Sequence, residues 1–211
     1  KEYWELYHQL MERDGVSPDD ARTIVRTNTT AIAALMLRRG EVDAMLCGTY
    51  GQYAWHLRYI RNVIGLEQGR RDVSALSIVI LPKGTIFLCD THVTPYPTAE
   101  ELVEMTELSV EQMRRFGITP KVALLSHSAF GSGNTPDVAK PREAVRILRE
   151  RNPDLEVEGE MTADAALNEK IRQRIFPNSR LTGTANLLVM PTLDASNIAF
   201  NMLKVLGDGL P

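Results

Sequence analysis

The chain has 211 residues, of which 44% are hydrophobic and 24% are charged, and its 24 Lys and Arg residues stand against 27 Asp and Glu. This composition is typical of a globular protein and excludes a disordered, collagen-like or disulfide-scaffold protein. The length is enough for one large domain or two small ones. The formal net charge of −3 argues against nucleic acid or an anionic membrane surface as a partner.

The two cysteines, Cys47 and Cys89, match no zinc-binding or redox spacing, so a reducing, cytoplasmic location is the simpler interpretation, and a disulfide between them stays open. No apolar run is long enough to cross a membrane. The first residues lack the layout of a signal peptide and read like the middle of a helix. The last residues are turn-rich, so we expect a fragment of a longer polypeptide.

Helical and strand patterns alternate in the first 94 residues. A capping Ser17 followed by Pro18 predicts a helix start, and a Pro82-Lys83-Gly84 turn predicts an antiparallel strand pair around it. The predicted helices cover about residues 3–13, 18–37 and 52–63, and the predicted strands cover 42–47, 73–81 and 85–88.

The second half repeats a strand–loop–helix pattern. Its predicted strands cover residues 121–125, 155–157 and 185–190, and its predicted helices cover 98–116, 137–151, 163–176 and 194–206, with Asp194 as the cap of the last helix. This alternation predicts an α/β fold with a mainly parallel sheet and helices on both faces. The break at Pro95-Tyr96-Pro97 predicts two α/β subdomains with a cleft, residues 1–94 and 95–211, and the last helix can return to the first subdomain.

Ligands of open α/β sheets bind beyond the carboxyl ends of the strands, which points to the loop of residues 126–134 (the 126–134 loop). Its glycines can bring backbone N–H groups close to an anion such as phosphate, although a flexible Gly-Ser loop is an equally good interpretation. Arg58 and Asn186 are weaker candidates for the same cleft. The candidate ligand-binding residues are Ser126, Ser128, Gly131, Ser132, Gly133, Asn134, Arg58 and Asn186.

Other polar groups follow predicted strands. Asp90 and His92 present a carboxylate and an imidazole, which are more often satisfied structural groups than catalytic ones. Glu158 and Glu160 can bind a metal from a turn, but a solvated turn is the more common arrangement for such a pair. No serine-hydrolase motif, P-loop or dinucleotide fingerprint is present.

Several segments together resemble the phosphate acetyl/butyryltransferase family. These segments are 44–48 (AMLCG), 95–102 (PYPTAEEL), 120–126 (PKVALLS), 164–167 (DAAL), 177–179 (PNS) and 185–191 (ANLLVMP). One branch is most similar, the C-terminal transferase-like domain of large bacterial NADP-dependent malic enzymes. The segments that resemble it are 3–4 (YW), 47–49 (CGT), 90–93 (DTHV), 125–132 (LSHSAFGS) and 159–161 (GEM).

The resemblance implies a phosphotransacetylase-like fold and a non-catalytic domain that senses acyl-CoA and helps to build a homo-oligomer. It implies no cofactor in this domain, acetyl-CoA as effector, and a malic enzyme domain of the same polypeptide that uses NADP and a divalent metal to convert malate into pyruvate and CO2. Active transferases carry an Arg where this chain, aligned on Gly15, has Met11. They carry a second Arg in a Leu-Arg-Pro pattern, of which Arg58 is kept and the Pro is replaced by Tyr59.

Three functions stay open from the sequence. The first is an acyl-CoA-binding regulatory domain, and the second is an active phosphate acetyltransferase that moves acetyl groups between CoA and phosphate. The third is a purely structural assembly module, in which the aromatic side chains of the first helix and of residues 50–59 form an interface.

Overall fold

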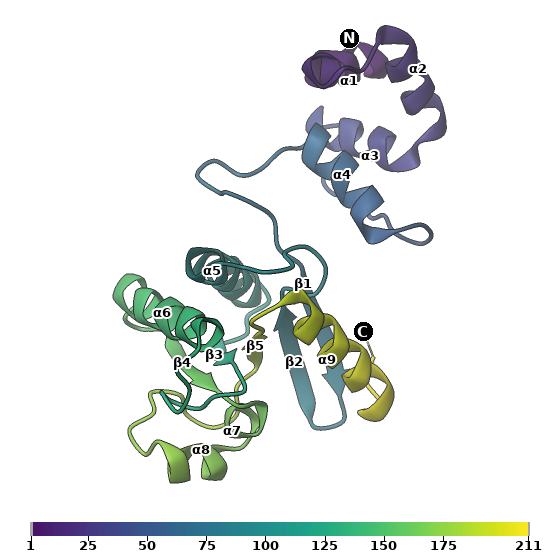
Figure 1. Ribbon diagram of the computed structural model, residues 1–211. Coiled ribbons are helices and arrows are strands. Elements are labelled where there is room, and N and C mark those ends of the chain that lie inside the picture. Colours follow the sequence, from purple (N-terminus) through teal and green to yellow (C-terminus); the bar gives the residue numbers. More distant parts are fainter. Residues whose placement is uncertain (1, 211) are drawn as a thin grey trace. The chain divides into compact units, whose positions relative to one another are not determined.

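A computed structural model describes residues 2–210, and the chain divides into two compact units, one up to Asp72 and one from Val73 onward (Figure 1). The described part of the first unit is helical. Its elements are α1 (Tyr3–Met11), the 3-10 turn η1 (Glu12–Asp14), α2 (Pro18–Thr27), α3 (Thr29–Arg38) and α4 (Tyr53–Val63).

Side-chain caps fix the helix boundaries of this unit. The hydroxyl of Ser17 accepts a hydrogen bond of 3.2 Å from the backbone N–H of Asp20, and Pro18 is the first residue of α2, as predicted. The single helix predicted over residues 18–37 is wrong. Asn28 has extended backbone angles and its side chain accepts from the N–H of Ala31 over 2.9 Å, so it ends α2 and caps α3.

The strand predicted at residues 42–47 is also wrong. This segment is irregular and forms no strand, and the Leu46 side chain is 99% exposed. An isolated strand is unstable without neighbours, and the described part of the first unit offers none. The core of this unit is instead a helical cluster made of Tyr7, Met11, Ala21, Ala31, Ala34, Leu35, Tyr59 and Val63.

The second unit has the predicted α/β fold. Its strands are β1 (Leu76–Leu81), β2 (Gly84–Cys89), β3 (Lys121–Leu125), β4 (Glu156–Met161) and β5 (Leu187–Val189). Its helices are α5 (Ala99–Arg115), α6 (Pro136–Arg151), α7 (Ala163–Leu167), α8 (Glu169–Ile175) and α9 (Leu193–Leu206).

The five strands form one sheet in the order β1-β2-β5-β3-β4. The β1–β2 hairpin is antiparallel, while β5 pairs in parallel with β2 and β3, and β3 pairs in parallel with β4. Because β2 joins this sheet through β5, the hairpin belongs to the second unit. The structure therefore divides the chain after Asp72, and not at the predicted boundary between Thr94 and Pro95.

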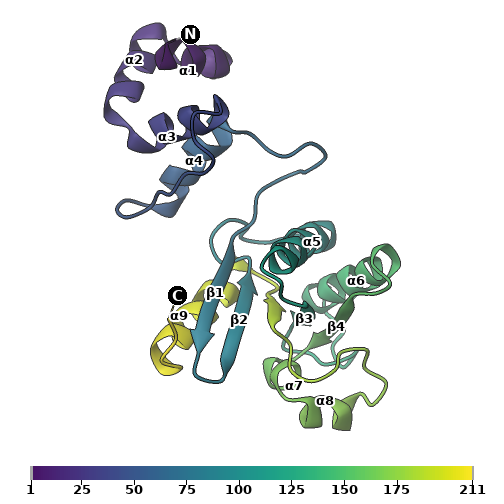
Figure 2. The same ribbon diagram turned by 180° about the vertical axis from the view of Figure 1, so that it is seen from behind.

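Helices cover both faces of the sheet, as Figures 1 and 2 show. Side chains alternate along β3, so Val122 and Leu124 pack in one apolar cluster with α5 and α6. Ala123 and Leu125 pack in the other cluster, with α7 and α9. The last helix contacts β1 and β2, which lie within the predicted first subdomain of residues 1–94 but belong to the second unit of the structure.

Several element boundaries of this unit differ from the prediction. The strand predicted at 155–157 continues to Met161, and the helix predicted at 163–176 is divided by Asn168, whose side chain caps α8. The cap of α9 is Thr192 and not Asp194, since the Thr192 hydroxyl accepts from the N–H of Ala195. Asp194 lies in the first helical turn, where a negative charge is also favourable.

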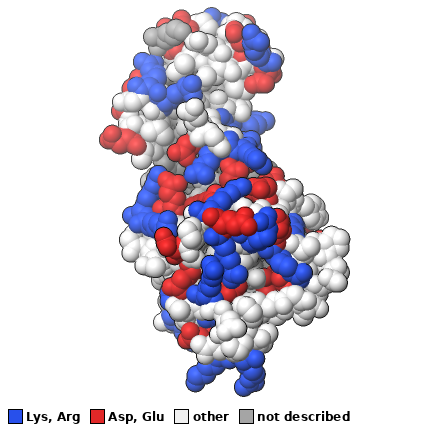
Figure 3. Space-filling view, turned by 90° about the vertical axis from the view of Figure 1, so that its left-hand side faces the viewer, with Lys and Arg blue, Asp and Glu red and all other residues white. Residues whose placement is uncertain are grey.

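Acidic and basic side chains alternate over the helices of the second unit (Figure 3). Many of them form surface ion pairs, such as those of Arg146 with Glu143 and with Glu150 on α6. Such a face produces no strong field of one sign. Within residues 2–210, no helix combines the length and the hydropathy that a bilayer crossing requires.

Candidate functional site

The 126–134 loop leaves the carboxyl end of β3 and leads into α6, as the sequence predicts. The N–H of Ser126 donates to the carbonyl oxygen of Met161 over 2.9 Å, which fixes the start of the loop against the end of β4. The Ser128 side chain is buried, whereas Gly131, Ser132 and Asn134 are exposed. Six of the eight predicted site residues therefore lie together at this edge of the sheet.

The carboxylate of Glu160, from β4, lies inside this loop. It is 1% exposed and accepts from the N–H of Gly131 over 2.8 Å and from the hydroxyl of Ser128 over 3.0 Å. Arg142 of α6 donates to both carboxylate oxygens, over 3.0 Å from Nε and 3.0 Å from Nη2. The buried carboxylate is thus ionised, paired and hydrogen-bonded at the same time.

The electrostatics of Glu160 follow from these contacts. Burial acts to raise the pKa of this carboxyl, but the hydrogen bonds from Arg142, Gly131 and Ser128 outweigh burial, so its pKa is lowered. Arg142 also donates to the carbonyl oxygen of Gly133 over 3.0 Å, so the same guanidinium connects the carboxylate to the far end of the loop.

Three further backbone amides of the loop are also used inside it. The N–H of Gly133 donates to the Ser128 hydroxyl over 2.8 Å, and the N–H of Ala129 donates to the Ser132 hydroxyl over 3.0 Å. The N–H of Ser128 donates to the Ser126 hydroxyl over 3.2 Å. The loop is therefore held by its own hydroxyls and by Glu160, and these N–H groups are not arranged as an open phosphate cradle.

An aromatic stack supports the tip of the loop. Phe130 has a positive φ of 48°, which is uncommon for a bulky residue, and its N–H donates to the carbonyl oxygen of Glu160 over 2.8 Å. Its ring stacks on Phe176, at the end of α8, with 4.6 Å between the ring centroids. The stack stabilises a backbone conformation that would otherwise be strained.

Asn186 does not join the loop. It lies at the amino end of β5, where its side chain accepts from the N–H of Lys121 over 2.7 Å and donates to the carbonyl oxygen of Thr119 over 2.9 Å. Lys121 begins β3, so this is the opposite end of the sheet from the 126–134 loop. Both polar groups of the amide are used to join two strands, which is a structural role.

Arg58 belongs to the first unit, on α4, and its side chain is exposed. Its guanidinium lies over the ring of Tyr59, 5.1 Å from the centroid, and donates to the Tyr59 hydroxyl over 3.3 Å. A cavity of about 230 Å³ opens beside the same helix. It is lined by Cys47, Gly48, Gly51, Tyr53, His56, Leu57 and Ile60.

Other predicted candidates have structural roles. The buried Asp90 carboxylate accepts from the N–H groups of Ala75, His92, Val93 and Thr94, so it fixes the turn after β2. Glu158 and Glu160 lie in a buried strand, and the solvated turn predicted for them is wrong. Glu158 pairs with Arg149 of α6.

Both cysteines are free thiols. Burial raises the pKa of the Cys89 thiol to about 12, which makes it a poor nucleophile, and Cys47 is exposed in the other unit. Among residues 2–210, no group of three or more His, Cys, Asp or Glu side chains is placed to hold a metal ion.

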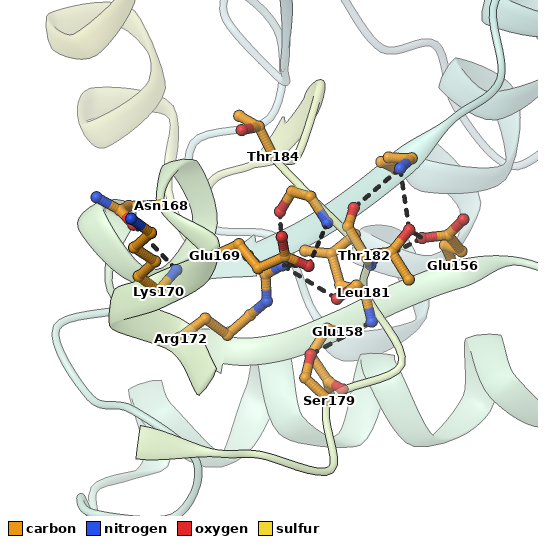
Figure 4. Close-up of polar contacts among 12 residues, drawn as sticks. Glu156, Glu158, Asn168, Glu169, Lys170, Arg172, Ser179, Leu181, Thr182 and Thr184 are labelled. Atoms are coloured by element: carbon orange, nitrogen blue, oxygen red, sulfur yellow. Dashed lines mark hydrogen bonds and ion pairs between the residues drawn. The ribbon is translucent and has the colours of Figure 1, made fainter. Parts of the chain in front are cut away.

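A buried arginine, Arg172 of α8, organises the segment before β5 (Figure 4). Its guanidinium donates to the carbonyl oxygens of Ala165 over 2.9 Å, Leu181 over 3.0 Å and Gly183 over 2.6 Å. Beside it, the Thr182 N–H and hydroxyl donate to Glu156. Neither Arg172 nor Arg142 could be singled out from the sequence, since each is one basic residue among several on a helix.

Comparison with known proteins places the whole arrangement in a family. The family model for phosphate acetyl/butaryl transferase matches residues 1–210. The chain belongs to this family. Its resemblance to that family, and to the malic enzyme branch within it, is therefore confirmed.

The most similar curated relatives include two malic enzymes. The chain is 49% identical over 210 residues to the NAD-dependent malic enzyme of Rhizobium meliloti, and 48% identical over 205 residues to the NADP-dependent malic enzyme of Escherichia coli. These alignments cover 100% and 97% of the chain but 27% of each malic enzyme. The chain thus corresponds to one domain of a longer polypeptide in these relatives.

Transferases of the family are more distant. The chain is 33% identical over 196 residues to the phosphate acetyltransferase of Haemophilus influenzae. This alignment covers 93% of the chain and 27% of that protein. Among solved structures, a phosphotransacetylase from Streptococcus pyogenes superimposes with a TM-score of 0.88 at 29% identity, over 99% of the chain and 64% of that protein. The α/β phosphotransacetylase-like fold is thereby confirmed.

Proposed function

We propose that the chain is a non-catalytic, acyl-CoA-binding regulatory domain of a malic enzyme polypeptide. The effector is an acyl-CoA, with acetyl-CoA as the first candidate, and it binds at the 126–134 loop. Regulation requires that the ligand binds one arrangement of the domains or subunits more tightly than another. Malate oxidation to pyruvate and CO2, with NAD or NADP and a divalent metal, is assigned to another domain of that polypeptide.

The observation that carries the non-catalytic assignment is the environment of Met11. Met11 stands where the resemblance implies that active transferases carry an Arg that contacts phosphate. Its side chain is 7% exposed and packs in the helical core with Tyr7 and Tyr59. A thioether in a core supplies no positive charge to an acyl phosphate. The higher identity to malic enzymes than to transferases supports the same assignment.

The loop is suited to ligand binding because its conformation is fixed before a ligand arrives. Glu160, Arg142 and Ser128 hold its backbone, so little conformational entropy is lost when a ligand binds to its exposed side. Ser132 and Asn134 are exposed at the carboxyl edge of the sheet, where ligands of such folds bind, and the Asn134 amide can offer polar contacts there.

The second candidate is an active phosphate acetyltransferase, and the retained, exposed Arg58 favours it. An assay for acetyl phosphate formed from acetyl-CoA and phosphate separates the two functions. We expect turnover no faster than in buffer, together with acetyl-CoA binding in a calorimetric titration of the full polypeptide. Measurable turnover would favour the transferase, and no binding at millimolar acetyl-CoA would contradict the regulatory proposal.

We also propose assembly into a homo-oligomer and a cytoplasmic location. Exposed apolar side chains on α9 support a contact with a second copy, because monomers rarely expose large apolar patches. These side chains are Ile198, Met202, Val205 and Leu206. Light scattering that detects only monomers would contradict assembly into a homo-oligomer.

The two free thiols are compatible with the proposed cytoplasmic location, because a reducing compartment keeps cysteines unpaired.

A further inference from the structure

Glu160 places a negative charge where the 126–134 loop would otherwise hold an anion. A phosphate in such a loop needs backbone N–H groups, hydroxyls and a cation around it. Here the N–H of Gly131, the hydroxyl of Ser128 and the guanidinium of Arg142 all donate to the Glu160 carboxylate, over 2.8–3.0 Å.

The charges of this cluster cancel. Arg142 carries one positive charge and Glu160 one negative charge, and their two hydrogen bonds hold them in a bidentate pair. Ser128, Gly131 and Gly133 contribute no net charge. Because the Arg142 guanidinium is already paired with the buried Glu160 carboxylate, the pair offers a second anion no unpaired cation.

The space inside the loop is also closed. A Cβ atom added to Gly133 would lie 3.1 Å from the Ser128 side chain and 3.2 Å from Val138, so the loop is closely packed against Ser128 and α6 at this position. At Gly131 an added Cβ would meet nothing within 4 Å. A ligand can therefore approach the outer side of the loop, at Gly131 and its exposed neighbours.

We infer that the 126–134 loop is a subsite for an uncharged, hydrogen-bonding part of a ligand, because Glu160 already fills its anion position. This inference rests on the proposed function and makes it more specific. In an acyl-CoA, the uncharged part is the acyl-pantetheine arm, with its thioester and two amides. The phosphate groups would then bind outside this loop.

Hydrogen exchange of peptides that cover residues 126–134 tests this inference in the full polypeptide. In the wild type, we expect S-acetylpantetheine, which carries no charge, to slow exchange in the loop, and inorganic phosphate to leave it unchanged. Slower exchange with phosphate would overturn the inference. Exchange unchanged by S-acetylpantetheine would overturn it too; if acetyl-CoA then still bound to the polypeptide, the proposed acyl-CoA sensing would stand but its site would lie outside this loop.

The variant Glu160→Ala tests the anion position directly. It removes the carboxylate and leaves Arg142, Ser128 and Gly131 without it, so we expect exchange in the loop to rise about tenfold. Formate should then restore slow exchange by filling the vacated position, whereas sodium chloride of equal ionic strength should not. The control Glu143→Ala removes an exposed glutamate from α6 and should show neither effect.

These outcomes separate the two claims. Rescue of Glu160→Ala by formate without any binding of acetyl-CoA to the wild type would support the anion position and contradict the proposed function. Acetyl-CoA binding without rescue by formate would contradict the anion position and leave the proposed function standing.

Discussion

The guanidinium of Arg172 donates to the carbonyl oxygen of Leu181 over 3.0 Å and, with its other contacts, ties α8 and the end of α7 to the segment that enters β5. The side chain is fully buried and contacts carbonyl oxygens in place of a carboxylate, apart from Glu169 at 3.9 Å. A buried charge of this kind depends on these hydrogen bonds from its two terminal nitrogens, because its buried Nε has no hydrogen-bond partner among residues 2–210.

We expect Arg172→Met to destabilise the chain by about 3 kcal/mol, because it leaves several buried carbonyl oxygens without a donor. Urea unfolding followed by circular dichroism measures this loss. The matched control is Arg174→Met on the same helix, where the side chain is exposed, and its effect should stay within about 0.5 kcal/mol. Equal effects of the two substitutions would contradict the role of Arg172.

The pH dependence of stability should report on Glu160. Its folded-state pKa lies below the ordinary value of 4.5, so its contribution is present above that value and is lost as the pH falls through the folded-state pKa. We expect Glu160→Gln to lower Tm by about 5 °C at neutral pH. The difference from wild type should shrink below about pH 4.5. A difference that stays constant or grows in acid would contradict this account.

Gly159 is required where β3 and β4 meet. It has a φ of +149°, and a Cβ at this position would lie 2.6 Å from the carbonyl oxygen of Leu124, which is backbone and cannot move aside. We expect Gly159→Ala to cost about 2–4 kcal/mol in urea unfolding. Gly117→Ala, also at positive φ but with open space around it, should cost about 1 kcal/mol and serves as the control.

Met11 should not tolerate the charge that the transferase pattern has at this position. We expect Met11→Arg to destabilise the helical unit by about 2–4 kcal/mol, because the guanidinium would enter an apolar cluster. Met11→Leu keeps the volume and should cost less than about 1.5 kcal/mol. Thermal unfolding of both variants measures these losses of stability. A Met11→Arg variant as stable as Met11→Leu would show that the site accommodates a cation.

Helix starts could be predicted because their signals are local. Ser17 before Pro18 and Thr98 before Glu101 are capping patterns, and both cap the helices that follow. The breaks at Asn28 and Asn168 could not be predicted from periodicity, since the apolar pattern continues across each of them. The Asn side chain decides the break by capping the next helix.

The interior of the candidate site could not be predicted, because its partners come from distant parts of the chain. Glu160 looks like a turn residue next to Gly159, and only the approach of Arg142, from α6, makes it a buried paired carboxylate. The position of the 126–134 loop could be predicted from the strand before it. The use of its N–H groups by Glu160 depends on the pairing of β4 with β3.

The function that we propose for this domain is to sense an acyl-CoA for a malic enzyme. The most direct test is malate-dependent reduction of NAD or NADP by the full polypeptide, measured against acetyl-CoA concentration with and without the residues of this chain. The account predicts a response to acetyl-CoA that is lost on deletion while malate oxidation persists. An identical response without the domain would contradict the claim and leave the chain as an assembly module.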